Sequence, residues 1–184
     1  PPVPLPPAPH ALSPLHPLAT HPHPAIAAFS HSGFSHLADH PLLARSVHAL
    51  SIRRALPLSA FHCNTLIAFY FRQGSSPAGA LHLFGEMPHR TSSSWYTAVS
   101  GCARCGLEST AFTLLRVMRE RDVPLSGFAL ASLVTACEHR GWQEGAACGA
   151  AIHALTHRAG LMGNVYIGTA LLHLYGSRGL VLNA

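Results

Sequence analysis

Four ten-residue blocks that end on glycine decide the fold: TLIAFYFRQG at 65–74, TAVSGCARCG at 97–106, SLVTACEHRG at 132–141 and ALLHLYGSRG at 170–179. In each block a small residue precedes two apolar residues, and an arginine lies one or two places before the glycine. The glycines follow one another at 32, 35 and 38 residues. A recurring period of this size is typical of stacked repeat units. The sequence therefore predicts an array of units of about 35 residues.

A second amphipathic stretch follows each of the first two glycines, namely AGALHLFGEMP at 78–88 and STAFTLLRVMRERDVP at 109–124. The spacing i, i+4, i+7 of the shared apolar positions places them on one helical face. Gly74 and Gly106 stand where a helix end takes a left-handed residue, and Pro88 and Pro124 terminate the second stretch. Each unit is therefore predicted to be a first helix, a tight turn and a second helix. The aligned pairs are Ala80 with Ala111, Phe84 with Leu115, and Met87 with Met118.

The third unit is longer than the others and carries Gly145 and Gly149 in its second half, GWQEGAACGAAIHALTHRAG. We predict that its second helix begins late or is irregular there. Upstream, VHAL at 47–50 matches IHAL at 152–155. That match predicts the second helix of an earlier, degenerate unit.

The composition divides the chain into two unlike parts. Overall, 184 residues with 48% hydrophobic and 10% charged side chains favour a packed core, and 12 arginines against 7 acidic residues give a net charge of +5, compatible with nucleic acid. The first 41 residues hold 11 of the 15 prolines and 7 of the 15 histidines. Residues 1–38 are predicted to be a disordered leader, poor in acids like an organelle transit peptide but without arginine. The rest is predicted to be an all-α, right-handed α-solenoid.

Metal, membrane and enzyme functions find little support in the sequence. Cys102 and Cys105 form a CxxC, but no second ligand pair follows at zinc spacing, and five unpatterned cysteines favour free thiols. The uncharged stretch 159–177 contains four glycines, which favours two helices around a turn over a membrane span. No phosphate-binding loop or nucleophile motif occurs. We therefore predict no metal, no cofactor, no small-molecule substrate, no membrane contact and no enzyme activity.

The chain resembles the pentatricopeptide repeat family, specifically the plant class that alternates long and short motifs (PLS class). The resemblance rests on the repeat period, the cycling unit lengths, the block NTLIAFY at 64–70 and the ending LFGEMP at 83–88. The resemblance covers about residues 42–184, and residues 83–90, 94–95, 131–137, 152–155 and 164–176 follow the motif order of that class. A tetratricopeptide array would show a Trp-Leu-Gly-Tyr pattern instead. The resemblance divides the chain into a leader at 1–38, a partial degenerate repeat at 39–59, a short-type unit at 60–91, a P-type unit at 92–126, a long-type unit at 127–164 and a truncated unit at 165–184.

By this resemblance the chain binds single-stranded organellar RNA, one base per unit, in RNA editing or processing in a mitochondrion or chloroplast. Editing-complex proteins are further implied partners. The resemblance also implies which positions of each unit meet a base. The fifth residues are Asn64, Tyr96, Ala131 and Thr169, the last residues are Thr91, Ser126 and Asn164, and the second residues, which stack on bases, are Phe61, Phe128 and Tyr166, with Ser93 in the remaining unit.

The chemistry of these residues supports base recognition unevenly. The amide of Asn64 and the hydroxyl of Thr169 suit hydrogen bonding to a base edge. Tyr96 departs from the small polar residue expected and Ala131 has no polar side chain, so their units are predicted to contact RNA without recognising a base. Asn64 could alternatively be a helix N-cap, and Phe61 and Tyr166 could be core residues.

The arginines and the chain ends leave further alternatives open. Five arginines lie near the predicted ends of second helices, where cations are stabilised by the helix dipole, with phosphate contacts as the alternative. The chain lacks an initiator methionine and stops in an apparent helix start, so we expect a fragment of a longer protein. A scaffold that binds another protein and a truncated product without function are the competing interpretations. The arginines are Arg53, Arg54, Arg116, Arg119 and Arg121.

Overall fold

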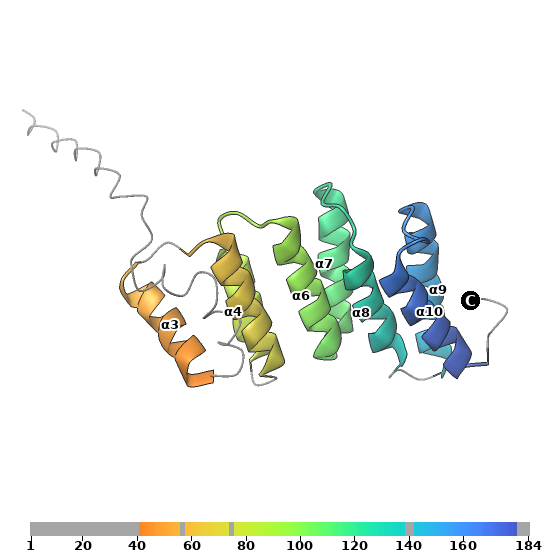
Figure 1. The fold of residues 1–184 in the computed structure, drawn as a ribbon, viewed down its shortest axis with the longest axis horizontal. Coiled ribbons are helices and arrows are strands. Elements are labelled where there is room, and N and C mark those ends of the chain that lie inside the picture. The colour runs from red at the N-terminus through yellow and green to blue at the C-terminus, as the bar shows by residue number, and fades with distance from the viewer. Residues whose placement is uncertain (1–40, 56–57, 74–75, 139–141, 180–184) are drawn as a thin grey trace, which may run out of the picture.

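The computed structural model describes residues 41–55, 58–73, 76–138 and 142–179, and its regular elements there are all α-helices (Figure 1). The all-α prediction is confirmed. The predicted leader, Gly74 and Gly141 lie outside the described residues. The helices are α3 (Pro41–Arg53), α4 (Ala60–Arg72), α5 (Pro77–Glu86), α6 (Ser92–Arg104), α7 (Glu108–Glu120), α8 (Gly127–Glu138), α9 (Trp142–Arg158) and α10 (Val165–Ser177).

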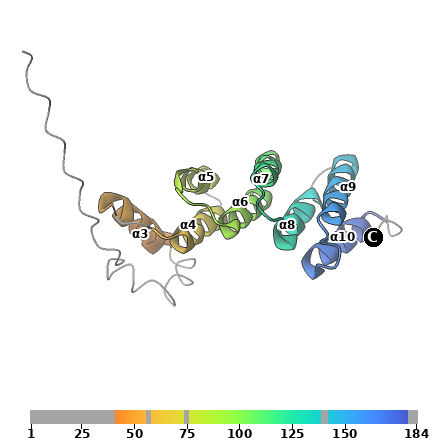
Figure 2. The same ribbon diagram turned by 90° about the horizontal axis from the view of Figure 1, so that it is seen from above.

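The helices form two layers that run along the array (Figure 2). The first helices α4, α6, α8 and α10 pack against one another in chain order, and the second helices α5, α7 and α9 cover one side of them. Each of these second helices contacts the first helix of its own unit and that of the next, and α3 contacts α4. Among the described residues, the backbones of successive second helices lie farther apart than those of successive first helices. The array is a helical-repeat solenoid, and the first helices keep one face uncovered.

Side-chain caps and left-handed residues set the helix boundaries. Ser59, Thr91 and Asn164 are the N-caps of α4, α6 and α10, and each side chain accepts a hydrogen bond from a backbone N–H of the first turn. Gly106 and Gly179 follow first helices with φ of +71° and +64°. The prediction that glycine ends the first helix is therefore confirmed at Gly106.

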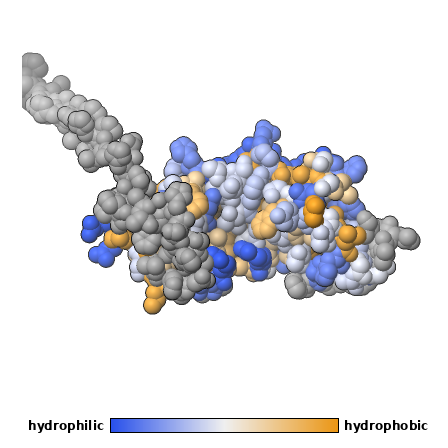
Figure 3. Space-filling view, viewed as in Figure 1, coloured by the Kyte–Doolittle hydropathy of each residue, from blue (hydrophilic) through white to orange (hydrophobic). Residues whose placement is uncertain are grey.

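The core lies between the two layers and repeats with the units. Ala80 and Ala111, which are aligned in the repeat, have no exposed area, and the aligned pair Met87 and Met118 is also buried. Ile67, Val99 and Val134 stand at equivalent positions of three successive first helices and are fully buried. In α10 the equivalent residue is Leu172, which is 60% exposed. Apolar surface accordingly gathers over α8 and α10 when the first-helix layer is viewed face on (Figure 3).

The second helix of the third unit differs from our prediction. Instead of beginning late or being irregular, α9 is continuous and, with 17 residues, the longest described helix. Its glycines serve close packing: a Cβ at Gly149 would overlap the side chain of Leu174, and one at Gly145 would overlap the guanidinium of Arg178. Arg178 is buried and donates to the carbonyl of Cys137 at 2.9 Å. Tertiary packing here outweighs the low helix propensity of glycine.

Two of the junctions between a second helix and the following first helix contain a histidine–tyrosine hydrogen bond. His48 Nδ1 lies 2.7 Å from the hydroxyl of Tyr70, and His153 Nδ1 lies 3.1 Å from that of Tyr175. Both pairs span 22 residues, and His153 follows His48 by 105 residues. The predicted match of 47–50 with 152–155 is thus confirmed as a structural equivalence. In α6 and α8 the residues equivalent to these tyrosines are cysteines, Cys102 and Cys137.

The stretch 159–177 forms the turn and helix that the sequence predicted. α9 ends at Arg158, Gly160 adopts a φ of +67° in the turn, and α10 begins at Val165. Within the described ranges, no helix has the length and apolar character required to cross a membrane.

We predict that Gly149→Ala lowers the free energy of unfolding by about 1–3 kcal/mol, because the added methyl group overlaps Leu174. Gly168→Ala is the matched control: this glycine of α10 has open space at its Cβ, so alanine should raise stability by up to about 1 kcal/mol. Urea unfolding of both variants measures the difference. Equal effects of the two substitutions would contradict the packing role of Gly149.

Stability should also depend on pH through His48. Burial lowers the pKa of His48 against the opposing effect of the Glu86 carboxylate, and burial lowers the pKa of His62 too. In the unfolded chain these histidines take up protons at about pH 6.5, before the folded ones do. Stability is therefore fully present well above pH 6.5, and it falls as the pH is lowered through about 6.5 and on through the lower pKa values of the folded histidines.

Replacing His48 by leucine, the residue at the equivalent place in α7, should make this fall shallower. Urea unfolding across the pH range measures the slope. The expectation is wrong if the variant and the original chain lose stability with the same slope.

Candidate nucleic-acid interface

The uncovered face of the first helices contains a groove between α8 and α10 with a volume of about 520 Å³. This volume suits a single nucleotide-sized ligand. Four of the predicted site residues meet here: Phe128 and Ala131 from one unit, and Tyr166 and Thr169 from the next. The remaining lining residues are Ser132, Thr135, Glu138, Val165, Ala170 and His173.

Two aromatic side chains stand at the rim of this groove. The rings of Phe128 and Tyr166 meet edge to face, with centroids 6.1 Å apart, and the two residues are 54% and 65% exposed. Phe61, at the equivalent position of α4, is 56% exposed. The alternative that Phe61 and Tyr166 are core residues is therefore wrong. Their predicted stacking on bases stays a prediction.

The four fifth-position residues all lie in first helices, but they differ in burial and in hydrogen bonding. Asn64 is half-buried in the second turn of α4, whose N-cap is Ser59, so the N-cap alternative for Asn64 is wrong. Its amide oxygen is buried and finds no hydrogen-bond partner in the described part of the chain. The hydroxyl of Tyr96 donates to the carbonyl of Pro124 at 2.9 Å. Ala131 is half-buried and Thr169 is exposed in the groove.

The last-position residues lie at the N-terminal ends of the first helices. Thr91 Oγ1 accepts from the backbone N–H of Ser94 at 3.3 Å. Asn164 Oδ1 accepts from the backbone N–H of Tyr166 at 3.1 Å, and its amide group lies against Gly127, where a Cβ would overlap it. Ser126 directly precedes α8. Capping thus explains the polar side chains of Thr91 and Asn164, and their contact with bases stays a prediction.

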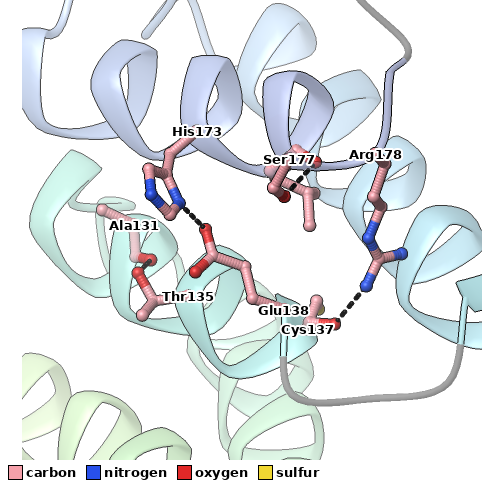
Figure 4. Close-up of polar contacts among 8 residues, drawn as sticks. Ala131, Thr135, Cys137, Glu138, His173, Ser177 and Arg178 are labelled. Atoms are coloured by element: carbon pink, nitrogen blue, oxygen red, sulfur yellow. Dashed lines mark hydrogen bonds and ion pairs between the residues drawn. The ribbon is translucent and has the colours of Figure 1, made fainter.

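A hydrogen-bonded glutamate–histidine pair, which the sequence did not predict, also lines the groove. Glu138 of α8 and His173 of α10 point toward one another, with Oε1 and Nδ1 2.8 Å apart (Figure 4). The side chain of Glu138 is 18% exposed and that of His173 is 71% exposed. The two residues are 35 residues apart, one repeat length. Thr135, between this pair and the aromatic rim, donates its hydroxyl proton to the carbonyl of Ala131.

The arginines that we predicted to be near second-helix ends do lie there, away from the groove. Arg53 ends α3, and Arg119 lies in the last turn of α7. Arg116 pairs with Glu120 at 2.8 Å, and the guanidinium of Arg121 lies over Trp95 at 5.5 Å from the ring centroid. Helix-end stabilisation and phosphate contact both stay predictions for these arginines.

Arg72 and Arg104, at the ends of α4 and α6, are the exposed arginines of the first helices. They line a second cavity of about 470 Å³ with Phe71, Pro77 and Cys105. The sequence signal was the basic residue before each repeat glycine.

The CxxC cysteines serve packing and hydrogen bonding. Cys102 is fully buried, and desolvation together with the nearby Cys105 raises the pKa of its thiol to about 12. The thiol of Cys105 donates to the carbonyl of Phe71 at 3.3 Å. In the part of the chain that the structure describes, no three His, Cys, Asp or Glu side chains gather as metal ligands.

The comparison with known proteins agrees with this architecture. No family model matches the chain, but curated proteins of Arabidopsis thaliana do. A pentatricopeptide repeat-containing protein labelled chloroplastic is 30% identical over 143 residues, which cover 78% of this chain and 22% of the relative. A second such protein is 30% identical over 145 residues, 77% of this chain and 19% of the relative. The chain belongs to the pentatricopeptide repeat family.

A third pentatricopeptide repeat relative, labelled mitochondrial, is 28% identical over 142 residues, 77% of this chain and 22% of its own length. The chain spans about a fifth of the length of these curated relatives. The resemblance to the pentatricopeptide repeat family is therefore confirmed, whereas membership of the class that alternates long and short motifs stays a prediction.

In this pentatricopeptide repeat array, Asn64→Leu should leave the free energy of unfolding unchanged or raise it by up to about 1 kcal/mol. An unsatisfied buried amide oxygen costs about 1–3 kcal/mol, and leucine of similar volume removes it. The control Ser59→Ala deletes the N-cap of the same helix and should cost about 1 kcal/mol. If urea unfolding shows equal losses for both variants, Asn64 makes a hydrogen bond that stabilises the fold.

Proposed function

We propose that this chain binds single-stranded RNA along the uncovered face of its first helices, as a non-enzymatic part of organellar RNA editing or processing. The observation that carries the proposal is the groove between α8 and α10, which gathers the second- and fifth-position residues of two successive units. Since the units stack at a regular spacing, equivalent positions form a row along the array. Such a row suits one unpaired base per unit.

Stacking supplies the first part of the binding energy. Phe61, Phe128 and Tyr166 each expose more than half of their surface on the first helices. A base stacked on an aromatic side chain contributes about 1–3 kcal/mol without regard to sequence. Ser93 stands at this position in α6. Stacking is therefore strongest at the α8–α10 groove, where two aromatic rings meet.

Base recognition falls to Asn64 and Thr169. Asn64 is half-buried on its first helix, and its amide has both the donor and the acceptor that a base edge requires. The exposed hydroxyl of Thr169 can donate or accept. Tyr96 is held by Pro124 and Ala131 has no polar side chain, so these two units add affinity rather than selectivity. The last-position residues Thr91, Ser126 and Asn164 stand beside the starts of the first helices, from where they contact the base together with the fifth-position residues.

Phosphate groups find cations at the C-terminal ends of the first helices. Arg72 and Arg104 are exposed there and line one cavity. Arginine forms bidentate contacts with phosphate oxygens, and each phosphate that is neutralised releases counterions. The binding of RNA should therefore weaken with rising salt.

We assign the chain to the pentatricopeptide repeat class that alternates long and short motifs. The histidine–tyrosine junctions at α3–α4 and α9–α10 support this assignment, because they recur after 105 residues, or three units. The organelle labels of two relatives support a mitochondrial or chloroplast location. Since the match covers about a fifth of each of those relatives, complete RNA specificity needs more repeat units than this chain holds, and editing-complex proteins are candidate partners of such a longer array.

A fluorescence-anisotropy titration of the 184-residue chain tests the proposal. Single-stranded RNA should bind more tightly than duplex RNA of the same sequence, because duplex bases are not free to stack. Phe128→Ala with Tyr166→Ala should weaken binding by about tenfold or more, from the loss of about 1–3 kcal/mol of stacking per base. Asn64→Leu should weaken binding only to some of the sequences in a pool.

Ile52→Ala is the matched control, since Ile52 is an exposed apolar residue of α3 outside the groove. It should leave RNA affinity unchanged. Equal binding of single strands and duplexes, or equal effects of the groove and control substitutions, would overturn the proposal and favour a scaffold that binds another protein.

A further inference from the structure

The Glu138–His173 pair places a carboxylate inside the proposed RNA-binding groove, which needs a physical reason. A carboxylate repels phosphate, and it can only accept hydrogen bonds when ionised. It lines the cavity with Phe128, Ala131 and Tyr166. Among the side-chain hydrogen bonds that the structure describes, it makes the one that joins the side chains of two successive first helices.

The position of Glu138 along α8 puts it past the base. Glu138 follows Ala131, the fifth-position residue, by seven residues, which is about 10 Å along a helix axis at 1.5 Å per residue. Thr135 lines the groove between them. A base that lies against Phe128 and Ala131 would therefore end before it reaches Glu138. In a nucleotide the ribose is bonded to the base, so the ribose would lie beside Glu138.

The hydrogen bond to His173 fixes which part of the carboxylate is available. Because an ionised carboxylate only accepts, His173 Nδ1 must donate to Oε1 of Glu138. The second carboxylate oxygen keeps its capacity to accept, and the side chain is partly exposed in the groove. Of the groups on a nucleotide backbone, phosphate offers this oxygen no proton, whereas the 2′-hydroxyl of ribose is a donor.

We propose that Glu138, positioned by His173, accepts a hydrogen bond from a ribose 2′-hydroxyl and so makes the α8–α10 groove selective for RNA over DNA. This inference rests on the proposed function and adds the chemical group that the groove distinguishes. The groove thereby gains a selective contact in a unit whose fifth residue, Ala131, recognises no base. His173 is a positioning residue that holds the carboxylate across the two helices.

The test compares RNA and DNA oligonucleotides of one sequence without uridine or thymidine, by anisotropy with the 184-residue chain. The measured quantity is the ratio of the DNA to the RNA dissociation constant, because loss of the carboxylate charge alters both affinities alike. Glu138→Leu should lower this ratio by about two- to tenfold, the effect of one net hydrogen bond. Glu138→Gln retains an acceptor and should keep most of the ratio. Glu120→Leu, on α7, should leave it unchanged.

A second measurement on the unsubstituted chain needs no variant to fold. RNA of the same sequence with 2′-O-methyl groups cannot donate from this position, so it should bind more weakly than RNA, by a similar factor. Equal binding of the 2′-O-methyl strand and RNA, or an unchanged ratio in Glu138→Leu, overturns this inference and leaves the proposed function standing. If the unsubstituted chain binds no single-stranded RNA, the proposed function itself fails.

Discussion

The structure depends on the contact between successive first helices. A single helix pair of this size cannot bury its apolar residues alone, and neighbouring units complete the core. Ile67, Val99 and Val134, at equivalent positions of three first helices, are fully buried, whereas Leu172 at this position of α10 is 60% exposed. Neighbours flank a first helix on two sides and second helices cover a third. Only one face remains for a ligand, and the positions on that face recur once per unit.

Glycine contributes to this packing in two different ways. Gly106 and Gly179 adopt left-handed backbone conformations that end first helices. Gly149, by contrast, is helical and admits Leu174, while Gly101 of α6 admits the ring of Phe71. The stability that glycine costs a helix, about 1 kcal/mol, is offset by closer contact of the neighbouring helix. The same residue type thus limits one helix and brings others together.

The sequence was sufficient to predict the helical repeat, because the period and the apolar spacing reflect local helix geometry and regular stacking. It is insufficient where packing overrides local preference: Gly145 and Gly149 predict an irregular helix, but α9 is continuous and accommodates Arg178 and Leu174 at these glycines. The N-cap alternative for Asn64 failed because Ser59 caps that helix. Glu138 and His173 escaped notice because residues one repeat apart meet only when the units stack.

The wider spacing of the second helices has a mechanical consequence. Bending the array toward or away from its uncovered face changes the spacing of α5, α7 and α9, whose backbones lie farther apart than those of the first helices. The array then bends at the junctions between a second helix and the following first helix, and these junctions are of two kinds. The directional histidine–tyrosine bonds at α3–α4 and α9–α10 resist sliding, whereas cysteines stand at the positions of these tyrosines in α6 and α8. The array should therefore flex most in its middle units.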